Sequence, residues 1–238
     1  KNVNFAQGLN GKVAGVQIRQ GTAGAGSSTK IQLRGAKNIT SSNQPLFVID
    51  GIPMANYQTS DANGFYGGRD SGDGLSNINP EDIASVTVLR GANAAALYGS
   101  QGANGVILIT TKQGEEGKTR INISSTTQVE RVYDYPDLQF RYGATGEPGA
   151  DSSWGEPGNY KNYVDDFFDT GITLQNAISL SGGNDKTTTY FSYANTHSNG
   201  TMPTNEFNKN NLTFKQTSKF FDDKVKVSSN VLLTDQRV

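Results

Sequence analysis

Residues 78–112 read INPEDIASVTVLRGANAAALYGSQGANGVILITTK, and this stretch alternates clear start and stop signals for short elements. Asn79, Pro80 and the two acids after them are typical of a helix start, because Asn caps, Pro fits the first position and carboxylates suit the positive end. We predict a strand over Ser85–Leu89, an alanine-rich helix over Ala92–Tyr98 that the next glycine ends, and a β-branched strand over Val106–Thr110. The stretch therefore indicates a compact unit of mixed helix and strand.

The segment before this stretch extends the same unit toward the N-terminus. Ile31 and Leu33 alternate with polar residues, which is the period of a half-buried strand. Asp50 and Gly51 tolerate the backbone angles of a sharp reversal, so we expect a tight turn at this pair. The remaining expected elements are a short helix over Val3–Asn10, strands over Val13–Arg19, Lys30–Arg34 and Pro45–Ile49, and a polar loop over Tyr57–Gly74.

The pattern changes at residue 118, after which only strands are expected. Five candidates of about 9–12 residues suit tilted strands that cross a bilayer. In the last one, Val225, Val227 and Val231 share one face while Lys226 and Ser228 share the other. A soluble β-sandwich gives the same alternation, so alternation alone leaves both architectures open and favours the commoner sandwich. The candidates are Thr119–Glu130, Thr173–Ser181, Thr187–Thr196, Asn210–Ser218 and Lys224–Leu233.

The lengths of the connections favour a membrane barrel over a sandwich. The first (about 131–172) and third (about 197–209) are long, whereas Gly182–Lys186 and Lys219–Asp223 are tight. Outer-membrane barrels have short turns on the periplasmic side and longer loops outside. A sandwich has no reason to alternate in this way.

The composition narrows the function classes. The 238 residues carry a formal net charge of −1, so the overall field attracts neither nucleic acid nor acidic lipid strongly. No cysteine is present, which excludes disulfides and thiolate metal sites. No run of about 18 apolar residues predicts a transmembrane helix. With 11 Phe and 10 Tyr, the chain has the aromatic content of a folded protein.

Three features invite a catalytic or binding role, and each has a simpler interpretation. The segment Gly21–Lys30 resembles a phosphate loop, but its lysine comes three residues too late, so a plain loop is favoured. His197 is the only histidine and has no motif around it for hydrolysis, and we expect no enzyme activity and no cofactor. Asp70 and Asp73 are weak candidates for a cation site, although the later bidentate Glu of an EF-hand loop is absent and a polar turn is favoured.

Two segments together resemble the plug of the SusC/RagA family of TonB-linked outer-membrane transporters. The first runs from Leu9–Val16 through Ile31–Gly35 to Pro45–Pro53, and the second is residues 78–112. The resemblance implies an α+β plug domain over residues 1–117, followed over 118–238 by about the first five strands of an antiparallel transmembrane β-barrel with long outer loops. The parent barrel is expected to have 22 strands with the plug in its lumen.

The same resemblance implies partners, location and cargo. The implied location is the cell outer membrane of a Gram-negative bacterium of the Bacteroidota. The implied partners are outer-membrane lipid and a SusD-like surface lipoprotein that acts as a lid, and the implied cargo is glycan or peptide. Energy is expected from TonB–ExbB–ExbD through a segment that precedes the plug. Because that segment and most of the strands are not in the sequence, we expect these residues to be a portion of a longer transporter.

Several side chains follow as candidate site residues. In this family, arginines at the positions of Arg34 and Arg90 latch the plug to barrel glutamates, which suits a bidentate guanidinium; the alternative is a strand-end Arg in water. Aromatic rings in the first outer loop could stack on sugars or pack against other loops: Trp154, Tyr160 and Tyr163. Aromatics expected in an interfacial girdle are Tyr190, Phe191, Tyr193 and Phe214.

TonB-dependent import with the plug as gate is therefore the leading functional hypothesis. The alternative is a non-transporting interaction component, or a client fragment held within an outer-membrane complex. An enzyme is a distant third hypothesis.

Overall fold

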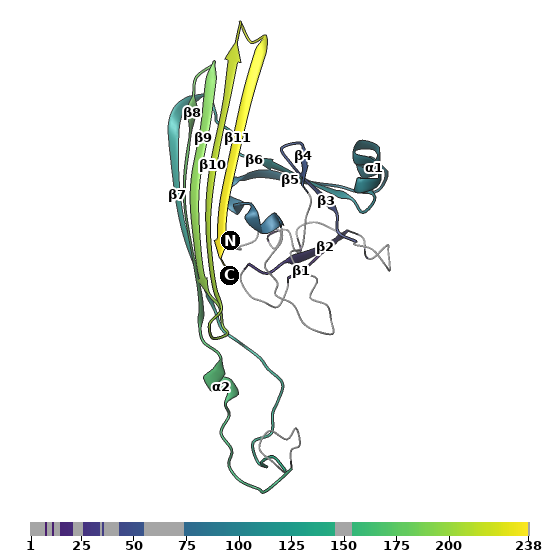
Figure 1. Cartoon of the computed structure of the whole chain (residues 1–238), viewed down its shortest axis with the longest axis vertical. Coiled ribbons are helices and arrows are strands. Elements are labelled where there is room, and N and C mark those ends of the chain that lie inside the picture. The colour runs from purple at the N-terminus through teal and green to yellow at the C-terminus, as the bar shows by residue number, and fades with distance from the viewer. Residues whose placement is uncertain are drawn as a thin grey trace.

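The computed structural model describes residues 8, 11, 15–20, 26–33, 35, 43–54, 74–145 and 154–237. Two parts stand side by side: an N-terminal unit, which comprises the described residues up to Thr111, and a tall wall of five strands (Figure 1). The unit lies against one face of the wall. Most of the expected helix over Val3–Asn10 and of the expected loop over Tyr57–Gly74 falls outside the described residues.

The N-terminal unit contains two sheets. Strands β1 (Val16–Gln20) and β2 (Thr29–Leu33) form an antiparallel pair. The second sheet has the order β4-β3-β6-β5, in which β3 and β6 are parallel and the other neighbours are antiparallel. Its strands are β3 (Leu46–Ile49), β4 (Ile52–Met54), β5 (Ile83–Leu89) and β6 (Val106–Thr111).

Alternation along the two central strands of that sheet builds two apolar layers. Phe47 and Ile107 face one way and join the larger core, which also contains side chains from β1 and β2. Val48 and Val106 face the other way and pack with Ala94 of helix α1. Neighbouring side chains on a strand point to opposite faces, so β3 and β6 serve both layers.

The helices of the N-terminal unit whose bounds lie within the described residues are short: η2 (Gly74–Asn77), η3 (Pro80–Asp82), α1 (Ala92–Tyr98) and η4 (Gly99–Gly102). The cap predicted at Asn79 is present, since its side chain accepts a hydrogen bond from the backbone N–H of Glu81 at 3.1 Å. The helix after it is a single 3₁₀ turn, because the chain becomes extended at Ile83. Helix α1 has the predicted bounds. No helix among the described residues is long and apolar enough to cross a membrane.

The wall is an antiparallel meander in the order β11-β10-β9-β8-β7. All five predicted strands are confirmed, and each is longer than expected because its polar ends stay in register with the neighbours. The strands are β7 (Gly117–Glu130), β8 (Gly171–Gly183), β9 (Thr187–Asn199), β10 (Glu206–Phe220) and β11 (Val225–Arg237).

The connections follow the predicted parity with one correction. Residues 184–186 and 221–224 make tight turns at one end of the wall, which we call the turn end. Residues 131–170, with a short helix α2 (Val164–Phe167), make a long connection at the opposite end, the loop end (Figure 1). The third connection is only 200–205, shorter than expected, because β9 continues to Asn199 and β10 begins at Glu206.

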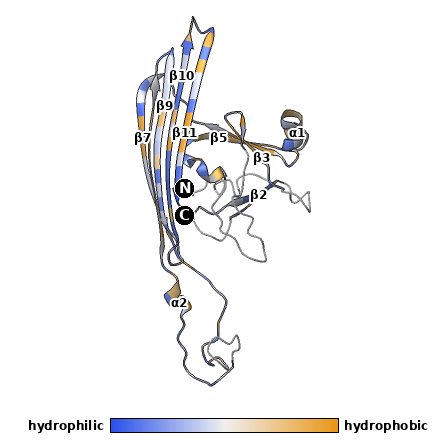
Figure 2. Cartoon of the chain, viewed as in Figure 1, coloured by the Kyte–Doolittle hydropathy of each residue, from blue (hydrophilic) through white to orange (hydrophobic). Residues whose placement is uncertain are grey.

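The two faces of the wall have inverted polarity relative to a soluble protein. The face against the N-terminal unit buries polar side chains such as Ser192, Asn211 and Thr213. The open face carries apolar side chains, among them Ile123, which is 78% exposed. Figure 2 shows this mixture of hydrophilic and hydrophobic positions along the strands. A β-sandwich buries its apolar face, so the sandwich interpretation is wrong for these strands.

Candidate functional site

The candidate site is the seam between the N-terminal unit and the inner face of the wall. Its centre is Asp82, the last residue of η3, whose exposed fraction is 3%. The carboxylate accepts three hydroxyl hydrogen bonds: from Tyr190 at 2.8 Å, Ser192 at 2.7 Å and Thr213 at 2.8 Å. Hydrogen bonds to an ionised acceptor are roughly twice as strong as neutral ones. Asp82 is therefore a strong polar anchor for the unit.

The register of the wall explains why three hydroxyls meet at one carboxylate. Tyr190 and Ser192 are two residues apart on β9, so they share a face. Thr213 on β10 is the direct cross-strand partner of Ser192. Asp82 is held from behind, since its backbone N–H donates to Asn79 O and its backbone C=O accepts from Lys112 N. The backbone on each side of the contact is thus held by hydrogen bonds within its own part of the molecule.

A second anchor lies at the β3–β4 hairpin. Asp50 and Gly51 have φ of 48° and 88°, the left-handed angles of a two-residue hairpin turn that matches strand twist. The Asp50 carboxylate accepts from Thr111 N at 2.9 Å and from the Thr111 hydroxyl at 2.6 Å. Lys215 on β10 donates to it at 2.6 Å and also contacts the Thr111 hydroxyl. The turn thus presents a carboxylate to a cation of the wall.

The environment of Asp50 shifts its ionisation. Burial alone would raise the pKa of the carboxyl. Hydrogen bonds from Lys215 and from Thr111, together with the positive charge of Lys215, outweigh burial and hold the pKa below its usual value. The side chains are 17% exposed for Asp50 and 9% for Lys215, so this ion pair is largely shielded from water. Asp50 therefore stays charged at neutral pH.

Two further contacts close the seam. The carbonyl of Asn77 accepts from Asn211 Nδ2 at 2.7 Å and from the Thr234 hydroxyl at 3.1 Å. Gly26 lies directly against the ring of Phe207 on β10, where a Cβ would come within 2.4 Å of a ring carbon. Gly26 also has a φ of +86°, so both space and backbone angle favour glycine there.

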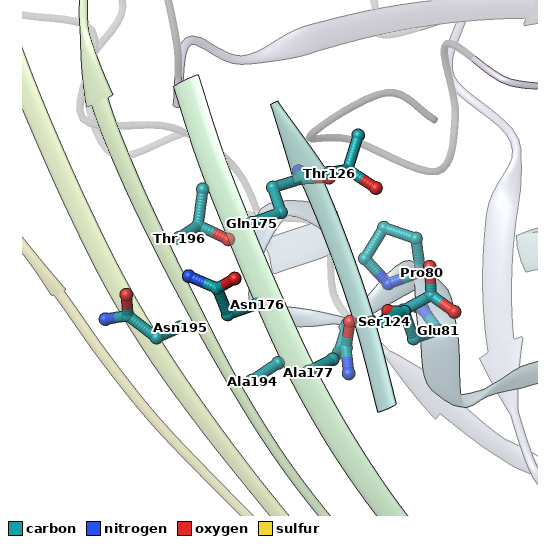
Figure 3. Close-up of a pocket in the computed structure, with 11 residues that line it drawn as sticks. Pro80, Glu81, Ser124, Thr126, Gln175, Asn176, Ala177, Ala194, Asn195 and Thr196 are labelled. Carbon is teal, nitrogen blue, oxygen red and sulfur yellow. Dashed lines mark hydrogen bonds between the residues drawn. The ribbon is translucent and has the colours of Figure 1, made fainter. Parts of the chain in front are cut away.

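The contact between η3 and the inner face of β7–β9 leaves small gaps. Pro80 and Glu81 face Ser124 and Thr126 across a small polar cavity (Figure 3). Its volume is about 20 Å³, and a neighbouring cavity has about 30 Å³, room for about one water molecule each. Asn79 borders both cavities, and its buried Nδ2 has no hydrogen-bond partner among the described residues. Water bound in these cavities would satisfy that amide.

The segment between β6 and β7 packs directly against the wall. Gly114 approaches the backbone of Thr189 so closely that a Cβ would lie 2.4 Å from its nitrogen. The backbone N–H of Glu115 donates to the Ser181 hydroxyl at 3.2 Å. This linker, residues 112–116, therefore follows the inner face of β8 and β9 before β7 begins.

Of the residues expected to act as a latch or as metal ligands, only Arg90 lies within the described residues. Arg90 is half-buried, and its guanidinium forms no ion pair or hydrogen bond with any residue the structure describes. Arg34, Asp70 and Asp73 lie outside the described residues. Within the described ranges, no three side chains of metal-ligand type gather. The arginine latch stays a prediction.

The expected loop aromatics lie far from the seam, in the 131–170 connection. Trp154 packs on Tyr142, with ring centroids 5.3 Å apart. Tyr160 donates to the backbone C=O of Glu156 at 3.0 Å and borders Gly143. Tyr163 is 70% exposed, and the ammonium of Lys161 lies 5.4 Å from its ring centroid. All three side chains thus make contacts within the loop, and Trp154 and Tyr163 remain largely exposed.

One aromatic prediction is wrong. Tyr190 was expected in an interfacial girdle with Phe191, but adjacent strand residues face opposite ways, and Tyr190 is buried against Asp82.

His197, on the open face, pairs with the Asn208 side chain at 2.5 Å. The described end of Gly21–Lys30 leads into strand β2, as expected for a loop that is not a phosphate site.

Sequence reasoning missed the seam itself. Asp82 was interpreted only as a helix-start acid, and Lys215 was not singled out. A lysine at the centre of a strand, on a face of Thr and Asn, is a usable signal for an internal charge partner. The hydroxyl pair Tyr190 and Ser192, two apart, is a second such signal.

Comparisons with known proteins agree with the architecture. Residues 1–106 match the family model described as TonB-dependent Receptor Plug Domain. The chain is 32% identical over 232 residues to the TonB-dependent receptor SusC of Bacteroides thetaiotaomicron, covering 93% of this chain and 22% of that protein. It is 38% identical over 136 residues to the TonB-dependent receptor P26 of Formosa agariphila, covering 56% of this chain and 12% of that protein.

Solved structures show the same fold. The RagAB peptide importer in its open-open state aligns with a TM-score of 0.78 and 20% identity, over 99% of this chain and 29% of that chain. The siderophore receptor PirA from Acinetobacter baumannii aligns with a TM-score of 0.56 and 17% identity, over 93% and 28%. These alignments cover between 12% and 29% of the length of the relatives, so the present chain spans less than a third of each of them.

Proposed function

The chain belongs to the SusC/RagA-like TonB-dependent receptors, and from this premise we propose that it is the gate and first wall segment of an importer of oligomeric nutrients. The proposed division is a plug over residues 1–117 and barrel strands over 118–238. The single observation that carries the proposal is the seam, where a compact domain is anchored by buried polar contacts to the inner face of a wall that is apolar outside. This is the arrangement that a plugged channel requires.

The dimensions of the wall support an outer-membrane location. Strands of 13–15 residues are long enough, at a tilt near 45°, to span about 30 Å. Their open face carries Ile121, Ile178 and Leu180, which suit hydrocarbon, while the inner face suits water or a plug. The relatives are receptors and importers, in agreement with the prediction that the chain is not an enzyme.

We assign the gating role to the two carboxylate anchors. Asp82 and Asp50 hold the unit against β9 and β10 through contacts that are polar and directional. Such contacts can be exchanged for water when the plug moves, whereas a large apolar interface would resist wetting. The predicted latch arginines Arg34 and Arg90 would act elsewhere, on glutamates of the rest of the barrel.

Partners and cargo follow as part of the same proposal. A SusD-like lipoprotein would cover the loop end, where residues 131–170 extend beyond the wall. TonB with ExbB and ExbD would supply energy from the turn end. The structural likeness to the RagAB peptide importer supports peptide as one cargo class, and the resemblance to the SusC/RagA family supports glycan as the other. The ring faces of Trp154, Tyr160 and Tyr163 are the proposed cargo-side aromatics.

Uptake by cells that carry the full-length receptor tests the proposal. Labelled oligosaccharides and oligopeptides are offered to cells with the receptor, without it, and with the receptor but without TonB. We expect accumulation of one cargo class only when both proteins are present. If labelled cargo binds to cells that carry the receptor but no cargo is taken up in a TonB-dependent way, the alternative, a non-transporting interaction component, would be supported.

A further inference from the structure

A cavity of about 160 Å³ lies at the neck of the long 131–170 connection, where the chain leaves β7 and returns to β8. It is lined from the β7 side by Arg131, Val132 and Tyr135, and from the β8 side by Val164, Phe168 and Asp169. This volume is the share of about five water molecules in liquid water. The cavity therefore has room for one monomer of an oligomeric cargo.

The walls of the cavity are held in place by their own contacts. Tyr135 accepts a hydrogen bond from Asn162 Nδ2 at 3.2 Å through its hydroxyl. The ring of Phe168 packs edge-to-face on Phe167 at 5.1 Å. The backbone N–H of Asp169 donates to Thr201 O at 2.9 Å, which ties the β8 side to the neighbouring β9–β10 connection. The cavity is thus a built feature of the loop base.

Its two charged side chains are both uncommitted. Neither the Arg131 guanidinium nor the Asp169 carboxylate makes a hydrogen bond or ion pair with any residue in the described part of the chain. Arginine stays charged at any physiological pH and binds a carboxylate with two parallel hydrogen bonds. An aspartate accepts hydrogen bonds from hydroxyl groups. A cation, a hydroxyl acceptor and an apolar surface therefore converge on one cavity.

From this convergence we infer that the cavity binds one acidic sugar ring, a hexuronate, of the cargo; the inference rests on the proposed import function. Arg131 takes the ring carboxylate, Asp169 accepts ring hydroxyls, and Phe168 with Val132 packs on the apolar C–H face. A peptide carboxylate would use Arg131 equally well, and peptide N–H groups could donate to Asp169, but a peptide has no sugar-ring C–H face to pack on Phe168 and Val132. An acidic peptide is therefore one arm of the test. A neutral sugar would leave Arg131 without a partner.

Calorimetric titration of the full-length receptor in detergent tests the inference. The probes are trigalacturonate, its carboxyl-reduced neutral counterpart and triglutamate. We expect trigalacturonate to bind most tightly, and Arg131→Gln to weaken it about tenfold or more, the effect of a charge-assisted pair. Arg131→Lys should recover part of the loss. Raising the salt concentration should weaken the binding of trigalacturonate and leave the binding of its neutral counterpart unchanged.

The matched control is Arg141→Gln, an exposed arginine of the same connection that does not line the cavity. It should leave the affinity for trigalacturonate unchanged. Equal affinities for the acidic and neutral sugars, tighter binding of triglutamate, or no effect of Arg131→Gln would each overturn the inference. TonB-dependent uptake can persist in all three cases, so the failure of the inference is distinguishable from a failure of the proposed function.

Discussion

Apolar and polar side chains alternate along the strands of both the plug and the wall, but the plug buries the apolar side chains and the wall buries the polar ones. In the plug the covered side chains are apolar, as at Phe47 and Ile107. In the wall the covered side chains are polar, as at Ser192 and Thr213, and the apolar ones are open. The difference shows that the two parts are built for different surroundings: the plug for water on its outside, the wall for hydrocarbon on its outside.

The largest expected effect is on the plug side of this comparison. Phe47→Ala removes a fully buried ring and should destabilise the plug by about 3–5 kcal/mol. Urea-dependent proteolysis of the plug in the full-length receptor measures it. The control Leu97→Ala, at a residue 68% exposed, should change stability by less than about 0.5 kcal/mol. Equal effects of the two changes would mean that the plug has no independent apolar core.

The next prediction compares two exposed isoleucines, one in each part. Ile123→Arg on the open face of β7 should destabilise the wall in a bilayer by about 2–4 kcal/mol, because the charge would enter hydrocarbon. Ile52→Arg, in the plug hairpin and 71% exposed, should have almost no effect. Folding into lipid vesicles, followed by gel mobility, checks both variants. A harmless Ile123→Arg would break the assignment of the open face to lipid.

The third prediction concerns the boundary between the parts. Asp82→Asn keeps one acceptor oxygen but removes the charge and leaves a buried hydroxyl poorly paired, so the plug should detach more easily by about 2 kcal/mol. Protection of the plug in urea, with the wall intact, is the measurement. Glu115→Gln is the control, because its ion pair with Arg120 is well exposed and worth little. Matching losses in both variants would argue against a buried anchor.

The smallest expected effect is a pH dependence at Asp50. Its pKa is lower in the folded protein than the ordinary value of about 4, so its contribution is present above that value and is lost as the pH falls through the folded pKa. We expect plug retention to weaken below about pH 4. The wild-type receptor and Asp50→Asn are compared by plug proteolysis between pH 6 and pH 3, and the variant should lose this component. Identical pH profiles would contradict the prediction.

Local signals were enough for much of the fold. Helix α1 runs over Ala92–Tyr98 as predicted, because glycines stand directly before and after it. The wall strands were found by period and spacing, yet they were predicted too short. Asn199 at the end of β9 and Glu206 at the start of β10 carry no strand signal and are held only by pairing across strands. Tertiary context overrides propensity at such ends.

The site was harder to predict than the fold for a physical reason. Asp82 meets Tyr190 and Thr213 at separations of 108 and 131 residues. Nothing in the neighbourhood of a carboxylate tells which distant strand will face it. Asp50 was placed in a turn correctly by its local sequence, whereas its partner Lys215 is 165 residues away. Local chemistry thus indicates the donor or acceptor, and only the assembled sheets identify its partner.

The linker of residues 112–116 limits how the gate can travel. Its five residues join β6, at the centre of the plug sheet, to β7, the first strand of the wall, and fully extended they reach about 17 Å. One point of the plug is therefore tethered to a stationary support, and the plug cannot leave the lumen as a free body. In the proposed gate, opening would therefore be a swing about that tether or a partial unravelling from the far end, with β6 the last strand to shift.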